Sequence, residues 1–166
     1  MESDAPFRMP VMDPCYFCEI INGTSDQWNV IERTALTITL LNARQFEIGQ
    51  CMVVPNKHTP TLLDLNEDEG AAVMVAAKKA ARAFVKAFAP DGVLLYQNNG
   101  VGSGQEVPHF HLHVVPRQPS SDWGFGPPHI ARLERNESRP PHLDPSVVTD
   151  AKREATRTLR TCFSAL

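Results

Sequence analysis

The sequence predicts a domain that combines several short strands with one long helix. Short apolar runs bounded by turn residues indicate the strands, and one longer segment with apolar residues at three- and four-residue steps indicates the helix. The chain has 166 residues, which is enough for one domain with a hydrophobic core. Hydrophobic residues make up 42% of the chain and charged residues 21%, values typical of a soluble globular protein.

Composition excludes several classes of partner. No apolar run is long enough to span a bilayer, and residues 1–14 lack the basic start and apolar stretch of a signal peptide. We therefore expect a cytoplasmic protein with no membrane partner. The formal net charge of −3 provides no basic field, so we expect no nucleic-acid partner. Small nucleotides are not excluded, since a few local donors can hold them.

The first third of the chain predicts an arm, a short helix and three strands. Three prolines in residues 1–14 favour a flexible N-terminal arm, and Asn22-Gly23 is a helix-ending signal for residues 16–22. The strands are expected at residues 29–33, at 36–40, where period-two alternation predicts a half-buried strand, and at 51–54, where a continuous apolar run suits a central strand.

The main helix is predicted to begin after Asn66. This residue can cap the helix, and Glu69 stands three residues later as in a capping box. A stripe of apolar residues follows, which we assign to the core: Val73, Ala76, Ala77, Ala80, Phe84 and Phe88. Residues 90–92 end the helix.

Two more strands, an arm and a second helix are expected in the remainder. Strands at 93–97 and 110–115 flank a flexible glycine loop at 98–104. Seven prolines between Pro116 and Pro145 predict an extended arm, and residues 150–163 have a helical pattern. We expect a domain over 15–117, with the arm and helix of 118–166 packed on it.

Three alternating histidines form the most unusual feature of the sequence. His109, His111 and His113 would share one face of a strand, because successive side chains point to opposite faces. The glycine loop just upstream could approach an anion closely through its N–H groups. This pairing suggests attack on phosphorus. From spacing alone, a metal site and a surface strand with accidental histidines stay open.

The segment His109-Phe110-His111-Leu112-His113-Val114-Val115 resembles the signature of the histidine triad superfamily. Residues 49–58 are similar to the strand of that family that ends in Pro-Lys-x-His, and residues 15–18 resemble its zinc-binding N-terminus. The resemblance covers about residues 15–117. It implies an α+β fold, in which one long helix packs on an antiparallel sheet of about five strands, and it implies a homodimer.

The resemblance also implies an enzyme that acts on small nucleotides. His111 would attack the α-phosphorus and form a covalent nucleotidyl-histidine, which water or another acceptor resolves. A neutral ring is needed, with a backbone carbonyl as the expected acceptor for its other nitrogen. His113 would donate to the phosphate or leaving group. The remaining contacts are expected from Asn98 to the phosphate, from N–H groups near Gly104 and Gln105 to the developing charge, from Asn42 to the ribose, and from Phe17 and Leu40 to the base.

Zinc-binding members of this superfamily imply a structural zinc ion. Its ligands would be Cys15, Cys18, His58 and His109, a set that suits a closed tetrahedral site. The two cysteines could instead be a surface dithiol or a pair of buried thiols. With zinc bound, His109 would belong to structure and His111 to chemistry.

Two residues depart from the family pattern. Gln50 stands where many members have histidine, and we expect little effect on the chemical step. Glu106 stands where serine or threonine is frequent, and its carboxylate would repel a polyphosphate. Either Glu106 points away, or the leaving group is cationic or uncharged. This departure favours phosphoramidate-type substrates over long polyphosphates, and replacing Glu106 with serine should change leaving-group preference more than binding of the free mononucleotide.

Three functions compete at this point. The first is a nucleotide hydrolase or nucleotidyl transferase, with phosphoramidate or dinucleoside polyphosphate substrates. The second is a nucleotide-binding interaction module with weak or no activity. The third is a zinc-stabilised scaffold that binds no nucleotide. The intact His111 and the anion-binding loop favour the first.

Overall fold

The computed structural model describes residues 6–118 and 149–166 and contains the expected α+β architecture. Five strands form one antiparallel sheet in the order β1-β2-β3-β5-β4. Their bounds are β1 Val30–Arg33, β2 Thr37–Leu41, β3 Cys51–Pro55, β4 Gly92–Tyr96 and β5 Leu112–Arg117. The helices are α1 Tyr16–Asn22, α2 Glu67–Phe88 and α4 Asp150–Ser164, with 3-10 turns η1 Leu62–Asp64 and η2 Val101–Ser103.

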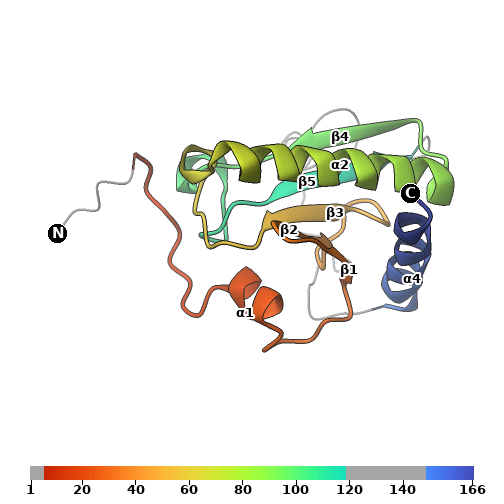
Figure 1. Cartoon of the computed structure of the whole chain (residues 1–166), viewed down its shortest axis with the longest axis horizontal. Helices are drawn as coiled ribbons and strands as arrows, with labels where there is room; N and C mark the ends of the chain where they lie inside the picture. The colour runs from red at the N-terminus through yellow and green to blue at the C-terminus, as the bar shows by residue number, and fades with distance from the viewer. Residues whose placement is uncertain (1–5, 119–148) are drawn as a thin grey trace, which may run out of the picture.

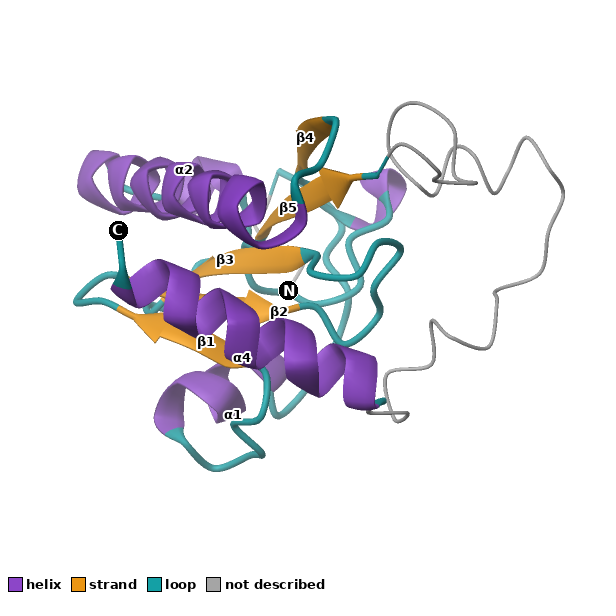
Figure 2. Cartoon of the chain, turned by 90° about the vertical axis from the view of Figure 1, so that its right-hand side faces the viewer, coloured by secondary structure: helices purple, strands orange, loops and turns teal. Residues whose placement is uncertain are grey.

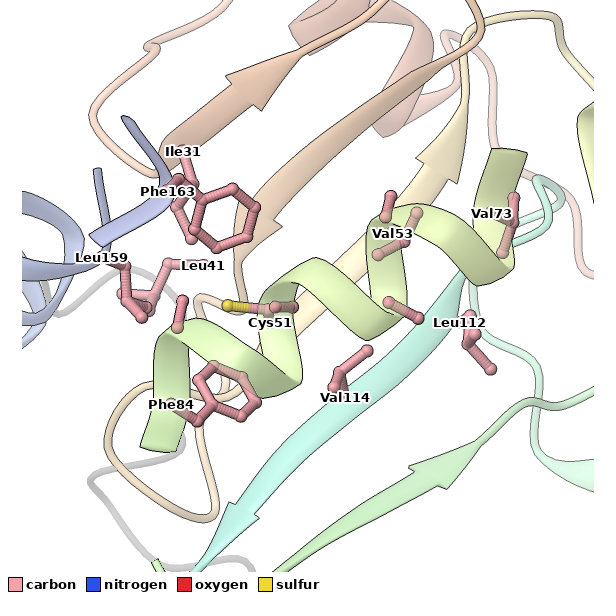
Figure 3. Close-up of a cluster of buried hydrophobic side chains, with 14 of the residues drawn as sticks. Ile31, Leu41, Cys51, Val53, Val73, Phe84, Leu112, Val114, Leu159 and Phe163 are labelled. Atoms are coloured by element: carbon pink, nitrogen blue, oxygen red, sulfur yellow. The ribbon is translucent and has the colours of Figure 1, made fainter. Parts of the chain in front are cut away.

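Two helices cover one face of the sheet. Figure 2 shows α2 and α4 side by side on this face, where α2 contacts β3 and β5 while α4 contacts β1 and β2. Figure 3 shows the core between these helices and the sheet, in which Cys51, Val53 and Val114 point from the sheet toward α2. Leu159 and Phe163 bring α4 into the same core. This cluster includes the apolar stripe that the sequence predicts for the long helix.

The opposite face of the sheet packs against α1 (Figure 1). Alternate residues of β2 and β3 project to this side and meet Phe17 and Ile20 of α1. Every residue of β2 is therefore buried, and the prediction of a half-buried strand was wrong. Helices on both faces remove the solvent-exposed side that alternation normally indicates.

The last strand starts later than the sequence suggests. β5 begins at Leu112, so only His113 of the three alternating histidines lies within it. The Phe110 N–H donates to the carbonyl oxygen of Thr59 at 2.6 Å, outside the sheet ladder. Phe110 and Leu112 nevertheless face the core beside α2.

The ends of the helices follow the predicted local signals. The Asn66 side chain accepts from the Glu69 N–H while the Glu69 carboxylate accepts from the Asn66 N–H, which completes the capping box. Gly23 ends α1 in the left-handed conformation. The proline-rich arm predicted after residue 117 falls almost wholly on 119–148, outside the described residues. Among the described residues, no helix is both long and apolar enough to span a membrane.

Candidate active site and metal centre

His111 is held as a neutral ring with a defined tautomer. Its Nδ1 lies 2.8 Å from the carbonyl oxygen of His109, and since a carbonyl can only accept, Nδ1 carries the proton. Nε2 therefore keeps its lone pair. Burial lowers the pKa of His111, and the carbonyl contact and the charge of Glu106 oppose this shift. A neutral imidazole with an unprotonated Nε2 is the form that can attack an electrophile.

His113 lies on β5 beside two polar partners. The ring of Tyr96 stacks on it with centroids 4.3 Å apart and planes at 14°. Gln50 Nε2 lies 3.4 Å from His113 Nδ1 and 3.3 Å from the Tyr96 hydroxyl. The Gln50 Oε1 accepts from the Phe46 N–H at 2.9 Å, so the amide must turn its NH2 group toward His113. Nδ1 of His113 then accepts, and Nε2 carries the proton.

A cavity of about 880 Å³ lies on the α1 side of the sheet. It brings together six of the predicted site residues: Phe17, Asn42, Asn98, Gly104, His111 and His113. Its apolar wall includes Tyr16, Phe17 and Trp28. Leu40 is not in this wall, because it is buried with Phe17 in the core under α1. The size and the mixed lining suit a ligand as large as a mononucleotide.

Gln105 supports the loop from behind and does not line the cavity. Its Oε1 accepts from the Gly100 N–H at 2.7 Å, and its Nε2 donates to the carbonyls of Pro60 and Val107. The N–H groups of Gly104 and Gln105 donate within the loop, to Val101 and Gly100. An anion that approaches this loop must therefore share these donors.

The segment before α1 runs along the same loop. The Val101 N–H donates to the carbonyl oxygen of Arg8 at 2.8 Å, and Met12 and Pro14 line the cavity. Gly100 has a φ of +76°, and a Cβ there would lie 2.7 Å from Cβ of Phe7. Glycine at this position allows both the left-handed turn and the close approach of the segment.

A charged pair at the cavity connects two loops. Arg44 Nη1 donates to the carboxylate of Glu106, and both residues line the cavity. Arg44 also fixes a neighbour, since its N–H donates to Asn42 Oδ1 at 2.9 Å. Glu106 is therefore paired with a cation, which its sequence context did not indicate.

The four predicted metal ligands converge. The ligand atoms of Cys15, Cys18, His58 and His109 all lie within 4.8 Å of one another. Nδ1 of His109 lies 3.6 Å from each of the two sulfur atoms, and Nδ1 of His58 lies 3.2 Å from Sγ of Cys18. Tetrahedral zinc, with bonds of about 2.3 Å to sulfur and about 2.0 Å to nitrogen, would separate such ligands by roughly 3.5 Å. The donor set and its spacing therefore fit zinc.

His109 is prepared as a ligand by its own backbone partner. Its Nε2 lies 2.9 Å from the carbonyl oxygen of Pro55, so Nε2 carries the proton and Nδ1 is open toward the thiols. Burial lowers the pKa of His109 to about 4, which keeps the ring neutral at pH 7. Neutral imidazole is the form that binds a metal.

Several lining residues could not be found from the sequence. Arg44 is one basic residue in a connecting loop and carries no motif. Tyr96 could have been noticed, because the strands flanking the glycine loop pair in register and place Tyr96 opposite His113. Met12 and Pro14 fall in a proline-containing arm with no periodicity.

Comparison with known proteins places the chain in a family. The HIT domain profile matches residues 25–120. "Protein hit" of Bacillus subtilis is 30% identical over 147 residues, which cover 89% of this chain and 99% of that protein. An adenosine 5'-monophosphoramidase of Schizosaccharomyces pombe is 30% identical over 112 residues, 68% of this chain and 80% of that protein.

Solved structures agree with this assignment. A crystal structure of a zinc-bound histidine triad family protein from Mycobacterium smegmatis superposes with a TM-score of 0.71 and 27% identity, covering 92% of this chain and 94% of that one. The family profile covers more than half of the chain, and the five-stranded antiparallel sheet with its long helix agrees with the fold that the resemblance implies. The chain therefore belongs to the HIT domain family.

Proposed function

We propose that this protein is a nucleotide hydrolase or nucleotidyl transferase that acts at the α-phosphate through His111. The observation that carries the proposal is the hydrogen bond from His111 Nδ1 to the His109 carbonyl, which leaves Nε2 as the nucleophilic atom at the cavity. The similarity to an adenosine 5'-monophosphoramidase supports the same chemistry.

The reaction divides into two displacements at phosphorus. In the first, Nε2 of His111 forms a bond to the α-phosphorus, and the leaving group departs with its electron pair. An amine leaving group takes a proton from solvent. In the second, a water oxygen bonds to phosphorus, the P–N electron pair returns to Nε2, and the water proton is released. An alcohol or phosphate in place of water would give transfer.

The surrounding residues would position the nucleotide for these steps. His113 would donate from Nε2 to a phosphate oxygen, and Asn98 and the loop at Gly104 would hold the phosphate region. The ribose would lie near Asn42, whose Oδ1 is already occupied by the Arg44 N–H, so its NH2 group is the part left to donate. The base would rest against the aromatic wall that includes Tyr16 and Phe17.

Zinc and a second subunit complete the proposal. Cys15, Cys18, His58 and His109 would hold a structural zinc ion, which would pin α1 to the sheet and supply no chemistry to the reaction. We also propose a homodimer. The terminal position of β4 in the sheet and the exposed side chain of Leu95 on that strand support an interface there.

Trapping the covalent intermediate tests the function. After mixing with adenosine 5'-phosphoramidate and rapid acid-free quenching, intact mass spectrometry should show one adenylyl group on the wild-type chain. His111→Asn should show neither the adduct nor turnover while still binding AMP. Hydrolysis at the wild-type rate by His111→Asn would contradict the mechanism. AMP binding with no adduct and no turnover by the wild-type chain would favour the nucleotide-binding module instead.

A further inference from the structure

The pair formed by Arg44 and Glu106 brings opposite charges from two loops to the cavity. Arg44 lies in the connection between β2 and β3, two residues after Asn42. Glu106 follows the glycine loop, five residues before His111. Their side chains meet, and both line the cavity that His111 and His113 also line.

The charge of Glu106 reaches the reacting centre. Glu106 and His111 line the same cavity, so a nucleotide phosphate bound beside His111 would lie in the field of the Glu106 carboxylate. The phosphate and the carboxylate are both negative, so they would repel each other. A balancing cation on Glu106 is therefore needed if the site is to accept an anion readily, and Arg44 supplies it.

Arg44 and Glu106 are exposed enough that either can be replaced to change the net charge at the cavity. The side chains are 39% exposed for Arg44 and 61% for Glu106. Such pairs contribute little to folding stability. The Arg44 guanidinium and the Glu106 carboxylate both face the cavity, so each can bind a ligand group in place of the other without a change in the surrounding structure. Either residue can therefore be changed without unfolding the protein.

We infer that Arg44 is a specificity-determining residue that neutralises Glu106, so that the site accepts nucleotides with either anionic or cationic leaving groups. The inference rests on the proposed function and extends it to the substrate class. Glu106 would attract a cationic amine leaving group, and Arg44 would attract a polyphosphate. The pair thus removes the bias against polyphosphates that Glu106 alone would create.

Calorimetric AMP binding to the full chain tests the neutralisation. Arg44→Gln should weaken AMP binding roughly tenfold and Glu106→Gln should strengthen it, because each leaves one uncompensated charge near the phosphate. The double variant Arg44→Gln/Glu106→Gln should return to within about threefold of the wild-type Kd. Arg157→Gln removes a more exposed pair on α4, Arg157 with Glu154, which lies outside the cavity lining, and should leave AMP binding unchanged.

Substrate preference gives a second readout. The ratio of kcat/KM for adenosine 5'-phosphoramidate carrying 1,4-diaminobutane on its nitrogen, a leaving group with a free ammonium, to kcat/KM for diadenosine tetraphosphate should rise in Arg44→Gln. The same ratio should fall in Glu106→Gln. A change in the same direction in both variants would overturn the inference.

The binding outcomes separate this inference from the proposed function. An Arg44→Gln affinity equal to wild type would overturn the inference alone. An equally weak Arg44→Gln and double variant would also overturn it, because Arg44 would then be holding the phosphate directly. Failure of the wild-type chain to bind AMP would instead overturn the proposed function, and the inference with it.

Discussion

At the scale of single residues, backbone carbonyls give neighbouring histidines different tasks. The Pro55 carbonyl fixes the proton of His109 on Nε2 and leaves Nδ1 open toward the two thiols. The His109 carbonyl fixes the proton of His111 on Nδ1 and leaves Nε2 unprotonated. His113 is set differently, by the side-chain amide of Gln50. Three histidines within five residues of chain thus present different groups: His109 an unprotonated Nδ1, His111 an unprotonated Nε2 and His113 an Nε2–H donor.

We predict that Gln50 positions His113. Gln50→Leu removes the NH2 group that faces Nδ1, so the His113 ring loses its fixed tautomer. We expect kcat to fall roughly tenfold, with a smaller change in the Kd for AMP. The Phe46 N–H also loses its acceptor, so the free energy of unfolding should decrease by about 1–3 kcal/mol. Steady-state kinetics, calorimetry and urea denaturation measure these effects.

Tyr96→Phe is the matched variant for this prediction. It keeps the ring stacked on His113 and the Gln50 contact to Nδ1, and it removes only the hydroxyl. Burial raises the pKa of Tyr96 to about 12, so this hydroxyl is uncharged at pH 7 and its loss removes no charge. We expect kcat to stay within about twofold of wild type. A Gln50→Leu enzyme with wild-type kcat would show that the amide has no positioning role.

At the scale of elements, local sequence signals predicted the ends of helices correctly, whereas the alternating pattern did not predict the burial of β2. The capping box at Asn66 and the helix end at Gly23 depend on a few neighbouring residues, and the sequence predicts both. The burial of β2 depends on α1 on one face and on α2 and α4 on the other, contacts that the alternating pattern within the strand does not record. The start of β5 depends on Thr59, which takes the N–H of Phe110.

The candidate site divides in the same way. The resemblance to the family assigns the triad and the four candidate metal ligands to numbered positions, so the sequence predicts them. Arg44 reaches Glu106 only because two loops converge, and no pattern in either loop records the contact. Tyr96 is intermediate, because strand register places it opposite His113.

The glycine loop offers a test at this scale. Gly100→Ala should cost about 1–2 kcal/mol of stability, because φ at this position is +76° and the new methyl group would meet Phe7. The displaced loop should also weaken AMP binding. Gly102→Ala is the control, since nothing lies within 4 Å of its added Cβ. Equal effects of the two substitutions on thermal unfolding and AMP affinity would argue against the tight approach of the N-terminal segment.

At the scale of the whole molecule, the candidate metal site brings together parts of the chain that the sheet does not join. Its ligands come from the start of α1, the segment after β3 and the approach to β5. α1 has only seven residues, too few to be stable alone. Zinc would therefore hold α1, and the cavity wall that α1 carries, against the sheet.

Metal removal should expose this role. We expect about one zinc per chain by elemental analysis and a Tm that decreases after chelation, because the metal binds the folded state. Cys15→Ser should lower both the zinc content and the Tm. Cys162→Ser, which lies outside the cluster, should leave the zinc content unchanged. A chelator-resistant Tm together with absent zinc would leave the two thiols without a metal role.

A substitution on the edge strand β4 tests the proposed homodimer. Leu95→Glu replaces an apolar residue, 41% exposed in the single chain, with a charged one. If β4 joins two subunits, sedimentation velocity should show a shift from dimer to monomer, since a buried unpaired charge is unfavourable. A wild-type chain that sediments as a monomer at all concentrations would contradict the homodimer.

His109 contributes to both candidate centres, with its ring in the Cys/His cluster and its carbonyl oxygen at the His111 ring. A substitution at this position would remove one of the four candidate zinc ligands and, by releasing the local backbone, would also disturb the acceptor that orients the proposed nucleophile. Loss of turnover in His109→Ala would therefore not mark its imidazole as a participant in the reaction. Scanning mutagenesis of the triad would count three essential histidines where the proposed chemistry uses two.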